Sequence, residues 1–314
     1  METFLKVFIN IKMLSKKKIV YPLKLLELAK KKGPVKAVIV NAIKLSAIES
    51  AKQAVEADLI DPTFIGDKSL IEKNAKEINW NISKFKLIHE PIENNTAPIA
   101  AKLASEGKVK IIIKGHIHTD VLMKAVLKRD LNLIGRKRLS HIWHMTLEKN
   151  DKPLIITDGA LNVLPKLETK MHILKNSIDF ANRINISRPK VSILSATEEI
   201  LESVPSSIEA NELTKRAKEE GLNADVFGPM AFDNSISEKA AQIKGIKNIV
   251  AGKADILLVP NVEAGNALVK MMIYFMGACA AGVVVGGKVP VVITSRADDV
   301  QARLASMAAA VVAL

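Results

Sequence analysis

Short β-branched runs alternate with amphipathic stretches along most of this chain, and this alternation restricts the possible folds more than any other feature. Continuous apolar strands separated by helices are typical of a mainly parallel sheet with helices on both faces. The pattern therefore predicts an α/β protein. Strands are expected at 35–40, 62–66, 86–89, 109–114, 141–147, 153–157, 190–194, 255–259 and 289–293. Helices are expected at 43–58, 68–79, 95–106, 119–129, 168–184, 207–220, 234–243, 263–279 and 299–313.

Charge is distributed unevenly along the chain. Its 314 residues suffice for one large or two moderate domains. Residues 1–144 hold 27 Lys and Arg against 14 Asp and Glu, whereas residues 145–314 hold 19 of each. The charge excess stops where the loop LEKNDKP begins, so we expect a domain change near 144–150.

A basic first half attracts polyanions, either nucleic acid or a phosphorylated small molecule such as coenzyme A. A lysine-rich solvated surface is the plainer alternative. The lysines are scattered, aromatic residues make up only 4%, and no nucleic-acid-binding motif is visible. Nucleic acid is therefore not an expected partner.

Cysteine content and hydropathy indicate a cytoplasmic protein. The single cysteine, Cys279, permits neither an intrachain disulfide nor a cysteine-based zinc site, which suits a reducing compartment. The uncharged segment 271–287 is shorter than the roughly 20 residues of a spanning helix, and glycines divide it. Lys6 and Lys12 interrupt the apolar N-terminus, and no cleavage site follows. No membrane partner is expected.

The first candidate site follows the strand at 109–114. A strand, a glycine loop and a Thr or Asp helix cap form a corner whose free N–H groups can bind an anion. Lys114, His118 and Thr119 lie there, and an ordinary strand-to-helix turn is the alternative. The histidines at 116, 118, 141 and 144 complete no recognisable ligand spacing, so we expect no metal.

A second candidate is the basic segment GRKRLSH at 135–141. Arg136, Arg138 and Ser140 precede a predicted strand there. Arginine side chains match phosphate oxygens well, so this segment could hold the pyrophosphate or ribose phosphate of a nucleotide-like ligand. A solvated basic turn is the alternative.

The sharpest candidate is ITSRADD at 293–299, which follows the strand VPVVI and opens the last predicted helix. Ser295 and Arg296 are expected at the carboxyl end of a strand and beside a helix N-terminus, and both places favour an oxyanion or phosphate. Asp298 and Asp299 fit the first helical turn electrostatically, so capping is the alternative role for them.

Four further polar residues occupy similar positions and are individually weak candidates. Glu263 and Asn266 follow the strand at 255–259, while Asp233 and Asn234 precede a helix. Their recurrence at strand and helix ends suggests one cleft. Cys279 is expected to be a small buried packing residue. The GxGxxG, GxxxxGK[ST], GxSxG and HExxH motifs are absent from the sequence.

Taken together, these segments resemble the phosphate acetyltransferase and phosphate butyryltransferase family, and the butyryl branch more closely. The likeness runs from about residue 35 to the end. Six ordered blocks carry it: IKGHIHTDVLM (113–123), GRKRLSH (135–141), TDGALNVLPKLETK (157–170), GPMAFDNSISEKAAQIKGI (228–246), ADILLVPNVEAGN (254–266) and ITSRADD (293–299).

The resemblance implies two α/β/α domains with the active cleft between them, as in the isocitrate and isopropylmalate dehydrogenases. Residues 1–17 would be an N-terminal extension, 18–144 plus 282–314 the first domain, and 145–281 the second. It further implies reversible transfer of a short acyl group between coenzyme A and inorganic phosphate, in a homodimer or larger homo-oligomer. Coenzyme A would be a substrate, with no metal, no permanently bound cofactor and no acyl-enzyme.

The family's active-site serine and arginine match Ser295 and Arg296. By that match Arg296 should hold the phosphate end of acyl phosphate, and Ser295 should contact the thiol or the developing oxyanion. Such catalysis works by orientation and charge stabilisation. Lys114, Glu263 and Asn266 are implied lining residues.

Three positions depart from the family pattern. Ala302 stands where the acetyl branch has an aspartate suggested as the thiol base, a residue that the butyryl branch also lacks. The proton acceptor therefore stays unassigned, with Asp298 as a candidate. Phe227 and Asn261 stand where aspartates are common, which could alter substrate choice or weaken activity.

Four alternatives stay open. A phosphate acyltransferase acting on acyl carrier protein is closely related, and a catalytically weakened homologue could still bind coenzyme A. The dehydrogenases of similar architecture need a carboxylate cluster for metal and a nicotinamide site, neither of which the sequence shows. A non-enzymatic basic binding protein would require strongly salt-dependent affinity for nucleic acid.

Overall fold

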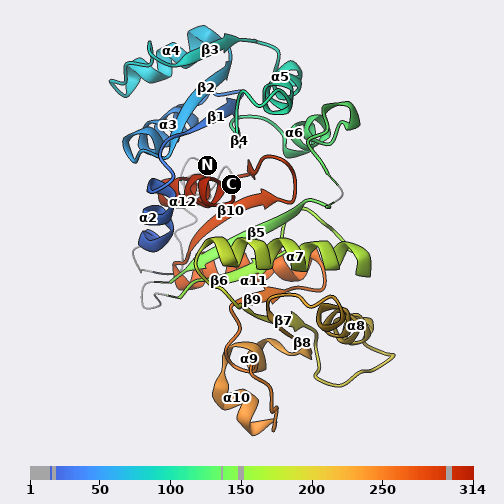
Figure 1. Cartoon of the computed structure of the whole chain (residues 1–314). Coiled ribbons are helices and arrows are strands. Elements are labelled where there is room, and N and C mark those ends of the chain that lie inside the picture. The colour runs from blue at the N-terminus through green and yellow to red at the C-terminus, as the bar shows by residue number, and fades with distance from the viewer. Residues whose placement is uncertain (1–14, 16–18, 136, 148–151, 295–298) are drawn as a thin grey trace, which may run out of the picture.

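The computed structural model describes residue 15 and residues 19–135, 137–147, 152–294 and 299–314. Its strands form one eleven-stranded sheet in the order β3-β2-β1-β4-β11-β10-β5-β6-β9-β7-β8 (Figure 1). Among these strands, pairing is parallel except around β10 and β5 in the middle of the sheet. The mainly parallel α/β fold predicted from the sequence is confirmed. The strands are β1 (Val35–Val40), β2 (Ile60–Gly66), β3 (Lys86–His89), β4 (Ile111–Lys114), β5 (Ser140–Thr146), β6 (Leu154–Thr157), β7 (Lys190–Leu194), β8 (Asp225–Met230), β9 (Ile256–Leu258), β10 (Cys279–Val285) and β11 (Val291–Val292).

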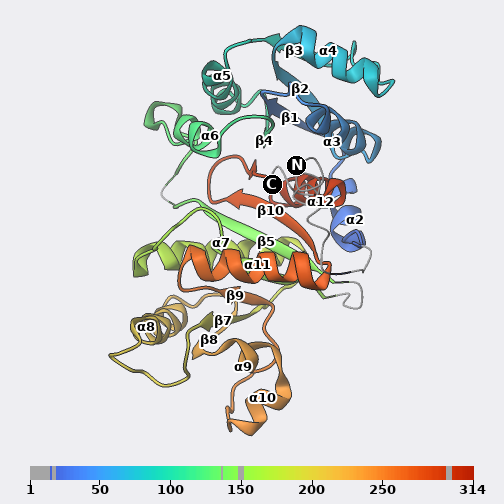
Figure 2. The ribbon, with the colours of Figure 1, turned by 180° about the vertical axis from the view of Figure 1, so that it is seen from behind.

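Helices cover both faces of this sheet. Figure 1 shows α7 in front of the middle strands, and Figure 2 shows α11 in front of them when the molecule is seen from behind. The helices are α2 (Leu23–Lys30), α3 (Leu45–Glu56), α4 (Lys68–Glu77), α5 (Glu93–Ser105), α6 (Thr119–Val126), α7 (Leu167–Arg183), α8 (Pro205–Glu219), α9 (Phe232–Ile236), α10 (Glu238–Ile243), α11 (Val262–Met276) and α12 (Val300–Val312), with a 3₁₀ turn at Arg129–Leu131.

The alternation of side chains along the strands explains the two covered faces. Successive residues of a strand point to opposite sides of the sheet. Ile142 and Ile155 belong to the core that contains residues of α7 and α12, whereas Trp143 and Ile156 belong to the core that contains residues of α11. Each middle strand therefore contributes apolar side chains to two separate cores.

Several elements differ from the sequence prediction, among them the helix expected at 234–243, which is two helices, α9 and α10. The helix expected to reach residue 279 ends at Met276, because Gly277 adopts a left-handed conformation with φ 70° and terminates it. The residues that follow form β10. Strand β8 was missed because Gly228 and Pro229 interrupt its apolar pattern; proline is tolerated there because β8 lies at the sheet edge. Helix α2 was also not predicted.

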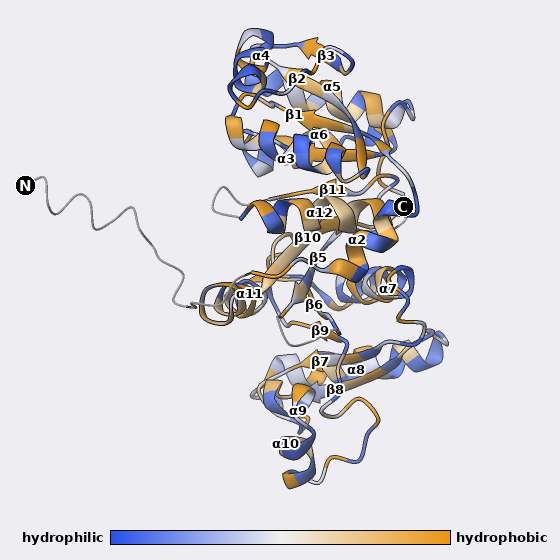
Figure 3. Cartoon of the chain, turned by 90° about the vertical axis from the view of Figure 1, so that its left-hand side faces the viewer, coloured by the Kyte–Doolittle hydropathy of each residue, from blue (hydrophilic) through white to orange (hydrophobic). Residues whose placement is uncertain are grey.

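Helix α12 is the central helix of the molecule. It packs against β10, α2 and α3, and its surface is largely apolar (Figure 3). A helix that is apolar around most of its circumference is normally buried. All residues of α12 are buried except Val300, Gln301 and Arg303. The burial of α12 fixes the position of Asp299, the N-cap of α12 and the last residue of the ITSRADD segment.

The last two strands return to the N-terminal part of the sheet. Strand β11 pairs with β4 in parallel, and β10 pairs with both β11 and β5. The division into domains at 18–144 plus 282–314 and at 145–281 stays a prediction. Among the described residues, no helix combines the length and the apolar character needed to cross a bilayer.

Candidate functional site

The carboxyl ends of β1, β4 and β11 lie side by side, because β1 and β11 each pair with β4 in parallel. Loops that leave such neighbouring strand ends form the usual binding position of α/β sheets. A cavity of about 360 Å³ lies there. Its walls come from the end of β1, the first turn of α3, the β4–α6 loop, Thr294 after β11, and one side of α12.

Two of these loops are held together by backbone contacts. The amides of Gly115 and His116 donate to the carbonyls of Val40 and Asn41, each over 2.9 Å. The Asn41 side chain donates back to the His116 carbonyl over 2.5 Å. A Cβ at position 115 would lie only 2.4 Å from the Val40 carbonyl oxygen. Glycine is thus required at this position, and the close approach fixes where Lys114 lies.

The cavity is lined by basic side chains. Lys44, Lys114 and Arg303 contribute to its wall, and the described lining residues include no Asp or Glu. Lys44 is also the N-cap residue of α3, whose first turn has no side-chain cap. A helix N-terminus carries a partial positive charge and free N–H groups. Cationic side chains and this helix end make the cavity suitable for an anion.

Arg303 connects α12 with the start of α3. Its guanidinium donates to the Ser46 carbonyl over 3.3 Å, and its backbone amide donates to the Asp299 carbonyl over 3.1 Å. Asp299 itself caps α12, since its carboxylate accepts from the Gln301 amide over 3.0 Å. The alternative role suggested for Asp299 from the sequence, helix capping, is therefore the one that its hydrogen bond shows.

Lys114 is the one predicted site residue that lines this cavity within the described part of the chain. Ser295, Arg296 and Asp298 lie outside the described residues, as does Arg136. Thr294, which is bonded to Ser295, is part of the cavity wall. His118 and Thr119 are exposed at the start of α6 and do not line the cavity.

The other residues of GRKRLSH lie where β5 begins. Ser140 is fully buried, and its hydroxyl accepts from the Asn176 side chain over 2.9 Å. The same Asn176 side chain donates to the Arg138 carbonyl, and the Arg138 residue is exposed. Lys137 forms an ion pair with Asp179 at 2.7 Å. Ser140 therefore serves packing, while the arginine is accessible to solvent.

Glu263 and Asn266 lie in the first turns of α11 and are both exposed. The Asn266 side chain donates to the Gly159 carbonyl over 3.4 Å. Helix α11 begins at Asn261, whose side chain accepts from the Ala264 amide over 3.0 Å. Asn261 stands where the family commonly has aspartate. Because asparagine and aspartate are comparable N-caps, the start of α11 is capped with either residue.

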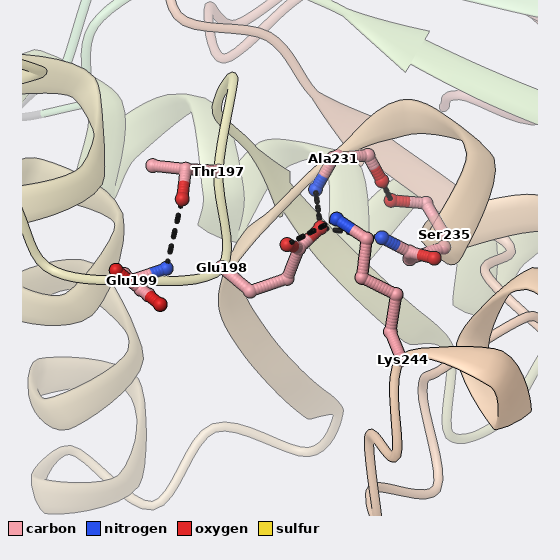
Figure 4. Close-up of polar contacts among 7 residues, drawn as sticks. Thr197, Glu198, Glu199, Ala231, Ser235 and Lys244 are labelled. Carbon is pink, nitrogen blue, oxygen red and sulfur yellow. Dashed lines mark hydrogen bonds and ion pairs between the residues drawn. The ribbon is translucent and has the colours of Figure 1, made fainter.

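Asp233 and Asn234 lie in α9, which follows β8 at a second corner, formed where β7 and β8 end. Figure 4 shows Glu198, Ala231 and Lys244 at this corner. Asp233 is exposed, whereas Asn234 is fully buried and donates to the Glu198 carboxylate. Lys244 of α10 donates to the same carboxylate over 3.0 Å, and the Ala231 amide does so over 3.2 Å. We call Glu198, Ala231, Asn234 and Lys244 the Glu198 cluster.

Electrostatics of the Glu198 cluster favour the ionised carboxylate. Burial alone would raise the pKa of Glu198. Hydrogen bonds from Lys244, Asn234 and the Ala231 amide outweigh that effect and hold the pKa below its ordinary value. In turn, the Glu198 carboxylate raises the pKa of Lys244. The charges of this corner therefore compensate one another.

Two buried histidines lie on β5, away from the cavity lining. Burial lowers the pKa of His141 to about 4, although the nearby Asp158 carboxylate opposes the shift. Burial likewise lowers the pKa of His144 to about 4. Both imidazoles are therefore neutral at neutral pH. No group of three or more potential metal ligands is found in the described ranges.

Sequence reasoning missed Lys44, Ser46 and Arg303, which all line the cavity. Lys44 and Ser46 follow the strand 35–40 directly, so the rule applied to the other strand ends would have found them. Arg303 is harder to find. The signal is one cation within the apolar stretch of the last helix.

The fold and site define an α/β protein with a basic cavity at the carboxyl ends of parallel strands. Comparison with known proteins names the family. Residues 84–311 match the model of the phosphate acetyl/butaryl transferase family, and the chain belongs to this family of acyltransferases. The family assignment made from the six sequence blocks is confirmed.

Individual relatives agree with this assignment. The chain is 38% identical to a phosphate acetyltransferase of Rhizobium meliloti over 91% of each chain. It is 36% identical to a phosphate butyryltransferase of Clostridium acetobutylicum, over 84% of this chain and 88% of the relative. A solved branched-chain phosphotransacylase from Enterococcus faecalis superposes with a TM-score of 0.77 at 31% identity, covering 88% of this chain and 97% of that one. These identities do not separate the acetyl and butyryl branches.

Proposed function

We propose that this protein transfers a short acyl group reversibly between coenzyme A and inorganic phosphate. In the forward direction a phosphate oxygen attacks the thioester carbonyl carbon. A carbon–oxygen bond forms, the carbon–sulfur bond breaks, and the departing thiolate takes up a proton. The products are acyl phosphate and free coenzyme A. Transfer is direct, without a metal or an acyl-enzyme.

One observation carries the proposal within this family. A cavity at the ends of β1, β4 and β11 is lined by Lys44, Lys114 and Arg303, and Thr294 brings the chain into its wall immediately before Ser295. Inorganic phosphate and acyl phosphate are both anions. Charge-assisted hydrogen bonds from lysine and arginine to phosphate oxygens are among the strongest in proteins. We assign the phosphate group to this basic lining.

The residues next to Thr294 are proposed to perform the chemistry. Arg296 holds the phosphate and stabilises the charge that develops during transfer, and Ser295 contacts the thiol or the oxyanion. Fixed donors aimed at a developing charge commonly contribute a factor of about 10² to 10³ in rate. Asp298 is the proposed proton acceptor, since Ala302 cannot act as one.

The rest of the coenzyme is proposed to lie against the basic half of the chain, with Arg136 and Arg138 toward its phosphates. Lys114, Glu263 and Asn266 are the other residues that we assign to the cleft by family resemblance. His118, Thr119 and Asp233 stay predictions from their places at strand and helix ends, whereas the fully buried Ser140 and Asn234 are bound within the protein by Asn176 and Glu198. A cytoplasmic homo-oligomer suits this assignment. Acyl carrier protein is the competing acyl donor.

The test is release of free thiol from acetyl-, propionyl- or butyryl-coenzyme A by the purified protein. Release must depend on added phosphate. Arg296→Ala is expected to lower kcat/KM for phosphate by at least about 100-fold, and Arg296→Lys by less. Arg188→Ala is the matched control, because Arg188 pairs with Asp225 at the start of β7 and β8. Undiminished turnover in Arg296→Ala would remove this residue from the mechanism.

The same assay separates the alternatives. Equal amounts of acyl carrier protein and coenzyme A thioesters identify the preferred donor. A protein that binds coenzyme A in a calorimeter but releases no thiol from any donor would be a weakened homologue, and the transferase proposal would fail.

A further inference from the structure

The inner wall of the cavity differs from its mouth. Lys44 and Ser46 at the mouth are exposed. Ile39, Ile113 and Met307 also line the cavity, yet their exposed fractions are only 1%, 3% and 2%. The lining therefore combines exposed polar side chains, here called the mouth, with three nearly buried apolar side chains, here called the inner wall. Ser50, at 5% exposure, is a buried polar member of the same lining. A ligand with one charged end and one short apolar end matches this mixed lining.

An acyl phosphate has this form. Its phosphate belongs with the cations at the mouth, and its hydrocarbon chain then points inward. Apolar groups gain free energy when they leave water for such a wall. We propose that the inner wall of this cavity binds the acyl chain and that Met307 sets the longest chain accepted. This inference rests on the proposed function, because it takes acyl phosphate as a substrate of this protein.

Met307 contributes to the cavity lining from the helix side. It lies on α12 one helical turn beyond Arg303, so the two side chains lie on the same face of the helix. Arg303 faces the mouth of the cavity through its bond to the Ser46 carbonyl. Ile39 and Ile113 lie on the neighbouring strands β1 and β4 and are register partners. Two isoleucines from the sheet and one methionine from α12 thus contribute apolar side chains to the lining.

The volume of the cavity suits short acyl chains. The cavity of about 360 Å³ is at the lower end of the range for small-molecule sites. Its rim must also hold the phosphate, which leaves a restricted apolar space. Methionine extends three heavy atoms beyond its Cβ, so Met307→Ala would open room for two or three additional carbons. Discrimination between chains that differ by one methylene typically amounts to about 10- to 200-fold.

The experiment measures kcat/KM for acetyl-, butyryl- and hexanoyl-coenzyme A in the thiol-release assay at saturating phosphate. Met307→Ala is expected to raise the hexanoyl-to-butyryl ratio at least about tenfold. Ala47→Leu, which narrows the same cavity from α3, is expected to lower the butyryl-to-acetyl ratio. The second variant keeps the proposal testable if loss of Met307 impairs folding.

Met171→Ala is the matched control. Met171 is equally buried, with an exposed fraction of 3%, but it lies on α7 and does not line the cavity. Its donor ratios should equal those of the unmodified protein. Unchanged ratios in both cavity variants, with an active unmodified protein, would overturn this inference and leave the transferase intact. Absence of phosphate-dependent release by the unmodified protein from every donor would overturn both.

Discussion

Two corners of this molecule both lie at the carboxyl ends of parallel strands, but they differ in the charged groups that they contain. One follows β1, β4 and β11, and the other follows β7 and β8. In the first, Lys44, Lys114 and Arg303 surround a cavity whose described lining holds no carboxylate. In the second, the Glu198 carboxylate accepts hydrogen bonds from Asn234, Lys244 and the Ala231 amide.

The difference shows that position in the fold alone does not identify a binding site. Both corners combine strand ends with helix N-termini. The second neutralises its charges internally and thereby ties the β7–α8 loop to α9 and α10. The lining of the first includes three cationic side chains and, among the described residues, no carboxylate, which suits it to an anionic substrate.

Among changes at the two corners, the largest effect is expected from Arg303→Ala. Loss of a charged hydrogen-bond donor at the cavity should lower kcat/KM for phosphate by roughly 10- to 100-fold, since such bonds contribute about 1.5–3 kcal/mol. Lysine keeps the charge without the arginine geometry, so Arg303→Lys should retain part of the activity. Initial rates over a phosphate series measure this.

Lys244→Ala supplies the comparison for that prediction. Lys244 is a cation of the second corner whose side chain is 52% exposed and paired with Glu198. Its loss should change kcat/KM for phosphate far less than the loss of Arg303. An equal reduction in both variants would show that the two corners share the phosphate, contrary to the contrast drawn above.

A moderate effect on stability is expected from Glu198→Gln. The amide cannot provide the charge that Lys244 and Asn234 stabilise, so the free energy of unfolding should fall by about 1–3 kcal/mol at neutral pH. Urea unfolding followed by circular dichroism measures it. If Glu198→Gln leaves the free energy of unfolding unchanged, the Glu198 cluster does not stabilise the packing of the β7–α8 loop against α9 and α10.

The contribution of Glu198 to the free energy of unfolding depends on pH. The pKa of Glu198 is lowered in the folded protein, so its contribution is fully present above the unfolded value of about 4.5. This contribution is lost as the pH falls below the unfolded value and then through the lower pKa that Glu198 has in the folded protein. The stability difference between Glu198→Gln and the unmodified protein should therefore shrink as the pH falls from 5 toward 3. A constant difference over that range would contradict the assignment.

The smallest effect is expected from Asn261→Asp. Asn261 caps α11 through its bond to the Ala264 amide, and aspartate caps a helix about equally well. The change should alter the free energy of unfolding by less than about 0.5 kcal/mol and leave kcat/KM within about twofold. A large gain in activity would show that this position lacks a catalytic carboxylate rather than providing only a cap.

Local patterns in the sequence predicted much of this fold. The β-branched runs located β1, β4 and β7, and the rule for strand ends found Lys114. That rule could not distinguish the two corners, because Asn234 and Lys244 both donate to the carboxylate of Glu198, which is distant from them in sequence. The Glu198 cluster therefore became visible only in three dimensions.

The remaining site residues were missed for a related reason. Arg303 belongs to the cavity because α12 is buried beside α3, a packing arrangement that no local pattern encodes. Helix α11 was predicted too long because its C-terminal stop depends on the left-handed conformation of Gly277. The position of Arg303 thus depends on tertiary packing, and the end of α11 depends on the backbone conformation of one glycine.

The most direct test is a crystal structure of the protein with bound butyryl phosphate. The account predicts that the phosphate lies within hydrogen-bonding distance of Arg303 or Lys114, at the mouth of the cavity, with the acyl chain toward Met307. A phosphate bound at the Glu198 cluster, or a cavity empty while the ligand occupies another part of the protein, would contradict it.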